Sequence, residues 1–198
     1  MMSTAIPSVA CLGVIGKNNN PLHISTFPSS SAIPSKTTKN LSANPSPPAP
    51  ILTPLQFSLL LSSTLDIFEA RTKNPSITPN LSGDYGLLHA IDERLAAYGF
   101  ETNTGVKFVA VVDMRGRVVS EEVVNKNPGL ALGLREGEMK IVFKGMQQAY
   151  IKLLQNPFFD PDEHSPPSGK GGKKISSRKF VEDIRRIGEN WMPGVGTL

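Results

Sequence analysis

The chain has very little cysteine. Cys11 is the one cysteine among 198 residues, so no intrachain disulfide can form. It lies in the apolar run from Val9 to Ile15, where a lone thiol usually behaves as a small buried hydrophobe. A chain without disulfides is typical of a reducing compartment. We therefore interpret the glycosylation patterns at Asn40 and Asn80 as chance matches.

Long apolar runs are also missing. No segment approaches the roughly 20 apolar residues that a membrane-spanning helix needs. The apolar stretch near the start has no basic residue before Lys17 and is interrupted by Pro7 and Gly13, unlike a secretory signal. The first arginine is Arg71, whereas organellar transit peptides are rich in arginine. The acid-free first third leaves a transit peptide open as the alternative.

The charge is nearly balanced over most of the chain. Residues 1–65 contain three lysines and no acidic residue, and the remainder contains 18 basic and 17 acidic side chains. Nucleic-acid binding usually requires a clustered basic face that displaces counterions from phosphates. We therefore exclude nucleic acid as the expected partner.

Apolar patterning predicts five strands. Residues 9–15 and 106–112 are apolar on both faces, which is typical of central strands covered on both sides. Residues 22–27 alternate apolar with polar, and residues 85–91 and 95–101 are bounded by turn signals. The first two strands form a hairpin and the last three a meander. Such a sheet needs helices on both faces, so the fold class is α/β (α+β).

Three helices are predicted to cover this sheet. Thr53-Pro54-Leu55-Gln56 has a capping box with proline at the first helical position, so a helix begins there and ends near Arg71. A second helix extends from Met139 to Asn156-Pro157, and Ser176 or Ser177 caps a third. The residues of the first helix that we expect to pack on the sheet are Phe57, Leu60, Leu61, Leu65 and Phe68.

Three segments interrupt this pattern. Residues 28–50 contain six serines and six prolines, a composition that buries too little apolar surface to offset its ordering entropy. We predict a single domain over residues 1–198. Its disordered or irregular insertions lie at 28–52, 115–135 and 161–175.

No motif in the chain is typical of catalysis. The run Gly169–Lys174 lacks the spacing of a phosphate-binding loop, and the three histidines lack the spacing of a zinc site. We predict no catalytic, cofactor-binding or metal-binding residue, and no enzyme. A further hypothesis is that the basic loop contacts anionic lipid headgroups. Its cations are Lys170, Lys173, Lys174, Arg178 and Lys179.

Four stretches, in their order along the chain, resemble the sedlin-like small subunits of the trafficking protein particle (TRAPP) complex. They are Asp84–Phe100, Lys107–Asp113, Asn156–Pro161 and Ser177–Phe180. The resemblance covers about 9–27, 54–113 and 136–190. It implies a longin-like, sedlin-like fold: a five-stranded sheet with one helix on one face and two on the other, and with the first and fifth strands central.

The resemblance also implies a function. Proteins of this family are noncatalytic adaptor or assembly subunits of the TRAPP vesicle-tethering complex in ER-to-Golgi and Golgi traffic. The implied partners are other small TRAPP subunits in a hetero-oligomer, and the whole complex acts on a Rab-type GTPase. The implied location is the cytoplasm, at most peripherally on ER, cis-Golgi and Golgi membranes, with no cofactor.

Two residues are candidates for a partner interface. Asp66 matches an acidic position on the first helix of sedlin-like proteins, and its other interpretation is an ordinary exposed helical acid. Phe158 and Phe159 either bury their rings as the chain turns between helices, or present one ring, Phe158, to a partner. The competing class is a free-standing longin-like or profilin-like domain that binds or senses a small ligand. A SNARE-type longin domain is a third class, normally followed by a heptad-repeat helix that this sequence does not show.

Overall fold

The computed structural model describes residues 3–29, 51–73, 83–126, 129–130, 133–135, 137–169 and 171–194. Its strands are β1 (Ser3–Ile15), β2 (Pro21–Thr26), β3 (Asp84–Ala90), β4 (Leu95–Glu101) and β5 (Lys107–Ser120). Its helices are α1 (Pro54–Lys73), α2 (Glu121–Lys126), α3 (Met139–Leu154), α4 (Pro161–His164) and α5 (Arg178–Asn190).

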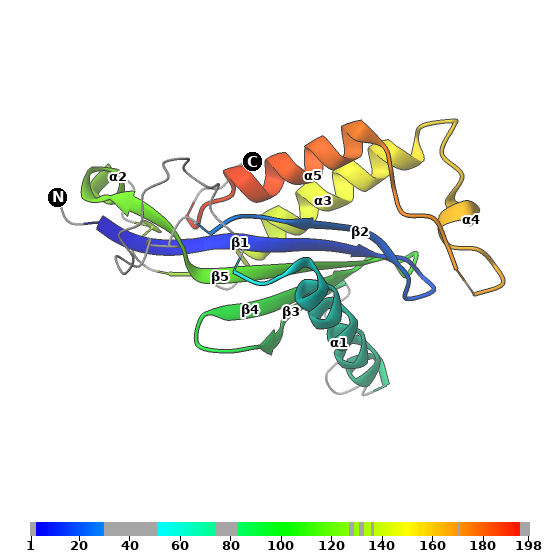
Figure 1. Cartoon of the computed structure of the whole chain (residues 1–198), viewed down its shortest axis with the longest axis horizontal. Helices are drawn as coiled ribbons and strands as arrows, with labels where there is room; N and C mark the ends of the chain where they lie inside the picture. The colour runs from blue at the N-terminus through cyan, green and yellow to red at the C-terminus, as the bar shows by residue number, and fades with distance from the viewer. Residues whose placement is uncertain are drawn as a thin grey trace, which may run out of the picture.

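The strands form one antiparallel sheet in the order β2-β1-β5-β4-β3. Helix α1 covers one face of this sheet, and α3 and α5 lie side by side on the other (Figure 1). The α/β (α+β) class, the longin-like arrangement of one helix against two, and the interior positions of β1 and β5 are therefore confirmed.

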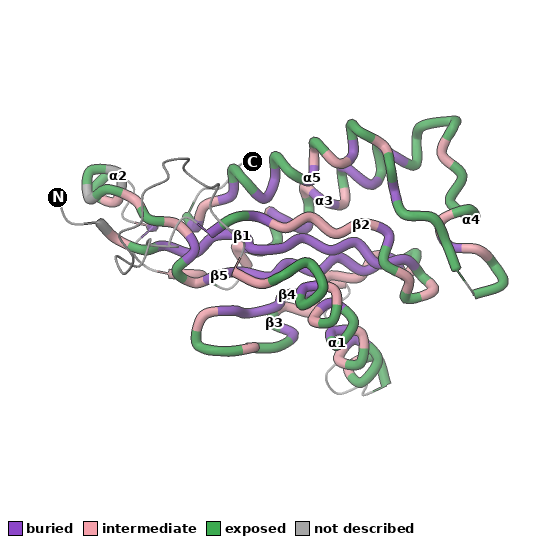
Figure 2. The backbone as a smooth tube through the Cα atoms, in the orientation of Figure 1, coloured by how far each residue is buried: buried purple, intermediate pink, exposed green. Residues whose placement is uncertain are grey.

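Strand β5 shows why both faces need cover. Phe108, Ala110 and Val112 pack into the core beneath α3 and α5, whereas Val109 and Val111 pack into the core beneath α1. All five side chains are fully buried, which explains the continuous apolar sequence of this strand. The buried backbone in Figure 2 follows β1 and β5 through the middle of the molecule.

Helix α1 begins at the predicted capping box. The backbone N–H of Thr53 donates to Gln56 Oε1 over 2.8 Å, and the N–H of Gln56 donates to Thr53 Oγ1 over 3.3 Å. Close approach to the sheet is possible because Gly13 has no side chain. A Cβ there would lie 2.8 Å from both Leu61 methyl carbons.

The buried face of α1 differs in part from the prediction. Phe57, Leu61, Thr64 and Phe68 are buried, whereas Leu60 and Leu65 are only half-buried. Thr64 tolerates burial because its hydroxyl donates to the carbonyl of Leu61 over 2.7 Å.

Residues 115–120 are a correction to the predicted irregular insertion at 115–135. They continue β5 and pair with the start of β1, in a register that includes Ser3 opposite Ser120 and Ile6 opposite Arg117. Helix α2 follows at once. Neither segment has a strong strand pattern alone, and each is ordered by pairing with the other. Residues 127–128, 131–132 and 136 lie outside the described part of the chain.

Residues 161–175 also have more structure than predicted. The N-cap Asp160 accepts from the N–H of Asp162 and starts the short helix α4. The amides of Asn18 and Asn20 donate to the carbonyls of Pro166 and His164, each over 2.6 Å, which ties this segment to the β1–β2 turn. Of the insertion predicted at 28–52, residues 30–50 lie outside the described residues.

Candidate partner-binding site

The outer side of α1 exposes apolar side chains to solvent. Leu55 is 70% exposed and Leu59 is 62% exposed, although leucine is usually buried. They lie four residues apart and so share one side of the helix. The first half of α1 has no charged residue, because Asp66 is its first. This leucine surface is suited to contact with another protein.

Asp66 extends the leucine surface along the helix. It follows Leu59 by seven residues, about two turns, so the three side chains point in similar directions. Asp66 is exposed and has no hydrogen bond or ion pair with any other residue that the structure describes. The sequence prediction of an exposed acid on the first helix agrees with this geometry, and its role in partner contact stays a prediction.

A second exposed apolar surface lies where α3 ends. Phe158 is 94% exposed, and Ile151 and Leu154 precede it at 45% and 41% exposure. The turn is fixed because the N–H of Phe158 donates to Asn156 Oδ1 over 3.2 Å. Phe159 is half-buried against the core, with its ring centroid 4.4 Å from that of His164. Of these two neighbouring rings, Phe159 packs against the core and Phe158 is exposed to solvent.

These two surfaces do not form one site. Helix α1 lies on one face of the sheet, whereas α3 lies on the other (Figure 1). The structure therefore separates Asp66 from Phe158, which the sequence alone did not place relative to each other.

Sequence reasoning missed a buried polar network at Asp113. Arg94 Nε donates to Asp113 Oδ1 over 2.7 Å and its Nη2 donates to Oδ2 over 2.8 Å, a bidentate pair. Ser29 Oγ donates to the same carboxylate over 3.0 Å, and the N–H of Arg115 also donates to it. The hydrogen bonds from Arg94 to Asp113 raise the pKa of Arg94 above its usual value.

The network fastens the β3–β4 turn to β5 and to residue 29. Asp113 is fully buried, and it directly follows the apolar run of β5. An acidic residue at the end of an apolar run was the sequence signal for this network. Its partner Arg94 lies 19 residues earlier, so the pair is not evident from the sequence. None of the residues in this network belongs to either exposed apolar surface.

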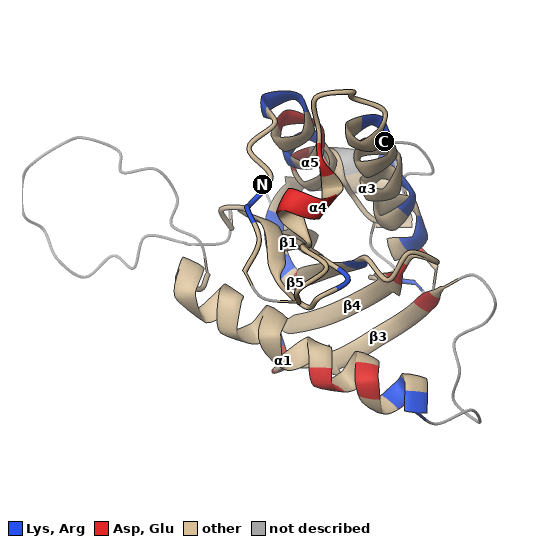
Figure 3. Cartoon of the chain, turned by 90° about the vertical axis from the view of Figure 1, so that its right-hand side faces the viewer, with Lys and Arg blue, Asp and Glu red and all other residues tan. Residues whose placement is uncertain are grey.

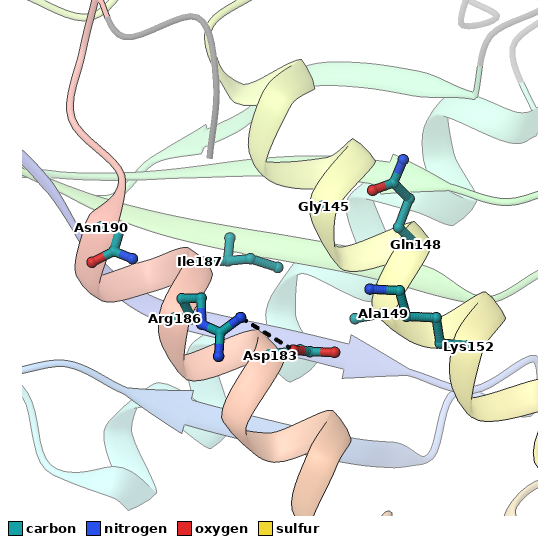
Figure 4. A pocket seen from close by; sticks show the side chains of 8 residues that line it. All are labelled: Gly145, Gln148, Ala149, Lys152, Asp183, Arg186, Ile187 and Asn190. Carbon is teal, nitrogen blue, oxygen red and sulfur yellow. Dashed lines mark ion pairs between the residues drawn. The ribbon is translucent and has the colours of Figure 1, made fainter.

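The side of α3 has several hollows, and two of them differ clearly in size. One, of about 410 Å³, lies between β3 and the start of α3 and is lined by Tyr98, Leu134 and Lys140 among others. The other is a smaller groove of about 150 Å³ between α3 and α5 (Figure 4). Gln148, Lys152 and Arg186 line this groove, and Arg186 pairs with Asp183 over 4.0 Å.

The remaining candidates for chemistry are scattered. Cys11 is buried, and burial raises the pKa of its thiol to about 12. His23 Nε2 lies 2.7 Å from Ser25 Oγ, and burial lowers its pKa. Among the described residues no group of three or more His, Cys, Asp or Glu side chains is placed to hold a metal ion. Nor does any described helix have the length and apolarity to cross a membrane.

The fold defines the class of protein: a longin-like α/β domain, here with exposed apolar surfaces on α1 and at the end of α3. Comparison with known proteins gives the family. The family model of Sedlin matches residues 14–190 of the chain. The chain therefore belongs to the Sedlin family.

Three relatives with the same name match most of the chain. The chain is 25% identical over 181 residues to the trafficking protein particle complex subunit 2-like protein of Dictyostelium discoideum, covering 90% of this chain and 95% of the relative. It is 24% identical over 172 residues to the protein of that name from Mus musculus, covering 86% and 89%. The protein from Xenopus tropicalis is 24% identical over 176 residues, covering 88% and 92%.

Proposed function

We propose that the chain is a noncatalytic adaptor subunit of a TRAPP-type vesicle-tethering complex. The observation that carries this proposal is the match to the Sedlin family over residues 14–190, with relatives named as subunit 2-like proteins of the complex. The separate apolar surfaces on α1 and at the end of α3 support it, because an assembly subunit needs contact area on more than one side.

The proposal includes the setting in which the subunit works. Its partners are other small TRAPP subunits in a hetero-oligomer, and the assembled complex acts on a Rab-type GTPase. The chain itself supplies surface for assembly and no catalytic group. It acts in ER-to-Golgi and Golgi traffic, in the cytoplasm and peripherally at those membranes.

Asp66 and the leucine surface form the proposed contact on α1. An exposed carboxylate beside two exposed leucines suits a partner with an apolar ridge and a basic side chain at one end. Phe158, with Ile151 and Leu154, forms the second proposed contact. An aromatic ring exposed in a fixed turn is a frequent anchor in protein interfaces.

The experiment is affinity purification of the tagged full-length chain from its native cytosol, followed by mass spectrometry. We expect small TRAPP subunits to copurify with the wild type. In Asp66→Tyr, the ring blocks the α1 surface and at least one of these subunits is lost. The matched control is Glu93→Tyr, an exposed acid in the turn between β3 and β4, which should retain them all.

Recovery of the wild type without other subunits would contradict the adaptor function. The alternative, a free-standing ligand-binding or sensor domain, then becomes the better function, and the hollow of about 410 Å³ beside β3 is its binding site. If Asp66→Tyr and Glu93→Tyr retain the same subunits, the adaptor function stands and Asp66 is an ordinary exposed acid.

A further inference from the structure

The net charge of the molecule is concentrated in one layer. Helix α3 contains three lysines and no acidic residue, whereas α5 contains four basic and three acidic residues. Their combined charge of +4 equals the formal net charge of the whole chain. Everything outside these two helices therefore sums to zero.

The acidic residues of this layer are already paired. Arg178 binds Glu182 over 3.0 Å and Arg185 binds Glu189 over 2.7 Å, while Arg186 lies 4.0 Å from Asp183. The unpaired charges of the layer are consequently cationic. Lys144, Lys152 and Lys179 are exposed, and their ammonium groups have no ion-pair partner among the residues described.

These cations share one outward surface. Helices α3 and α5 lie side by side over one face of the sheet, with α1 on the opposite face (Figure 3). Lys144, Lys152 and Lys179 are exposed, so they point away from the sheet that the two helices cover. At 1.5 Å per residue, the 16 residues of α3 extend the surface for roughly 24 Å. Lys152 and Lys179 both line a further hollow of about 210 Å³ between the two helices, distinct from the groove of Figure 4, and Lys144 lies two turns before Lys152.

The composition of this surface favours lipid over protein. Protein interfaces usually have an apolar centre, but the large exposed apolar residues of the two helices, Ile151 and Leu154, are confined to the C-terminal end of α3. A cationic surface without an apolar centre is complementary to a layer of phosphate headgroups. Each basic residue near an anionic bilayer adds a modest attraction.

The structure changes the sequence-based hypothesis that the basic loop contacts anionic lipid headgroups. Lys173 is engaged by Glu163 over 2.8 Å, and Arg178 is engaged by Glu182. Lys170 lies outside the described residues. Lys174 is exposed and has no ion pair with any residue that the structure describes. The loop therefore keeps one available lysine, and the other available lysines belong to the helix layer.

We propose that the outer face of α3 and α5 docks on the anionic phospholipid surface of a membrane, with Lys144, Lys152 and Lys179 contacting headgroup phosphates. This membrane contact uses a face other than the α1 surface. It belongs to the chain itself, and it does not depend on assembly with other subunits.

The experiment is vesicle flotation with the purified full-length chain. One set of vesicles is phosphatidylcholine alone, and the other is phosphatidylcholine mixed with phosphatidylserine. We expect the wild type to bind the anionic vesicles selectively and to dissociate as salt rises, because salt screens exposed charges. Lys144→Glu/Lys152→Glu/Lys179→Glu should bind them about a hundredfold more weakly.

The control has the same change in net charge on other faces: Lys73→Glu/Arg115→Glu/Lys126→Glu. These three side chains are exposed, so both triple variants should unfold at similar urea concentrations. If both triple variants lost binding equally, net charge alone would explain the binding, and the proposal would be overturned. Failure of the wild type to prefer anionic vesicles would also overturn it, whatever subunits copurify with the chain.

One further outcome identifies another class of partner. If the wild type ignores both kinds of vesicle, but the α3–α5 triple variant loses copurifying proteins, the cationic face binds an acidic protein. That result overturns the lipid proposal and leaves the adaptor function intact.

Discussion

Arg94 and Asp113 illustrate how a single buried acid constrains the chain. The Asp113 side chain is 1% exposed, and its two oxygens accept from Arg94, Ser29 and the backbone of residue 115. Arg94 is 36% exposed and is therefore partly solvated by water. The two partners are unequal, because loss of the arginine leaves a buried carboxylate with no compensating charge.

Replacement of Arg94 with methionine should therefore destabilise the fold. We expect Arg94→Met to lower the free energy of unfolding by about 3 kcal/mol, since removal of one partner from a buried ion pair is costly. Urea denaturation followed by circular dichroism measures this. Arg115→Met, which removes a neighbouring exposed cation, should change stability by less than about 0.5 kcal/mol. Equal stability of the two variants would refute the structural role of the pair.

The thiol of Cys11 should be inert in the folded protein. Its side chain is fully buried and its pKa is raised to about 12 by burial, so the reactive thiolate is scarce near pH 8. We expect a disulfide reagent such as dithionitrobenzoate to release almost no chromophore from native protein, and one equivalent per chain in denaturant. Rapid release from the native chain would show that β1 opens or that the thiol is accessible.

The environment of some of these residues could be predicted from the sequence, and that of others could not. Burial of Cys11 followed from its apolar neighbours, and exposure of Asp66 followed from its position on α1. The Arg94–Asp113 pair did not follow, because it depends on the β4–β5 register that brings Leu95 opposite Asp113. Nor could composition distinguish Phe158 from Phe159, since the division depends on which ring the turn directs at His164.

Among the secondary-structure elements, strand β3 lies at an edge of the sheet, and Arg71 covers part of that edge. The guanidinium of Arg71, in the last turn of α1, donates to the carbonyls of Tyr85 and Leu87, each over 2.7 Å, and to Leu88 over 3.3 Å. A guanidinium held against these carbonyls competes with the strand of another chain for the same acceptors. Unprotected edge strands pair with one another and cause aggregation.

Arg71→Met should expose this edge. We expect stability to fall by about 2 kcal/mol, because hydrogen bonds from a charged donor are lost, and we expect dimers or larger species to form at high concentration. Size-exclusion chromatography with light scattering measures the species. Lys73→Met is the control, because among the described residues Lys73 pairs with Glu69 alone, over 3.7 Å, and it is highly exposed. Monomers of both variants at all concentrations would contradict the protective role.

The elements themselves were largely predictable, for physical reasons. Periodicity and capping identified α1, α3, α5 and the five strands, since burial on a sheet imposes a regular apolar pattern. The extension of β5 to Ser120 was missed because its partner is the start of β1, more than a hundred residues away. Helix α4 was missed because contacts with the β1–β2 turn, made by Asn18 and Asn20, hold its surroundings in place.

In the molecule as a whole, the sheet separates two kinds of surface. The α1 side presents Leu55, Leu59 and Asp66. The other side presents the cationic layer of α3 and α5, with Phe158 at one end. A partner on α1 and a partner at Phe158 therefore do not compete for the same area. This geometry supports the proposed function, in which the chain connects two neighbours.

Two independent contact surfaces predict that a variant in each surface loses different copurifying subunits. Leu59→Asp places a charge in the leucine surface and should abolish one set of copurifying subunits, whereas Phe158→Asp should abolish a different set. Both side chains are exposed, so each variant should unfold within about 0.5 kcal/mol of the wild type. The double variant should lose both sets, because distant sites act independently. Quantitative mass spectrometry of the purified assemblies measures this. If either single variant loses both sets, the two surfaces serve one shared interface and the chain does not bridge two neighbours.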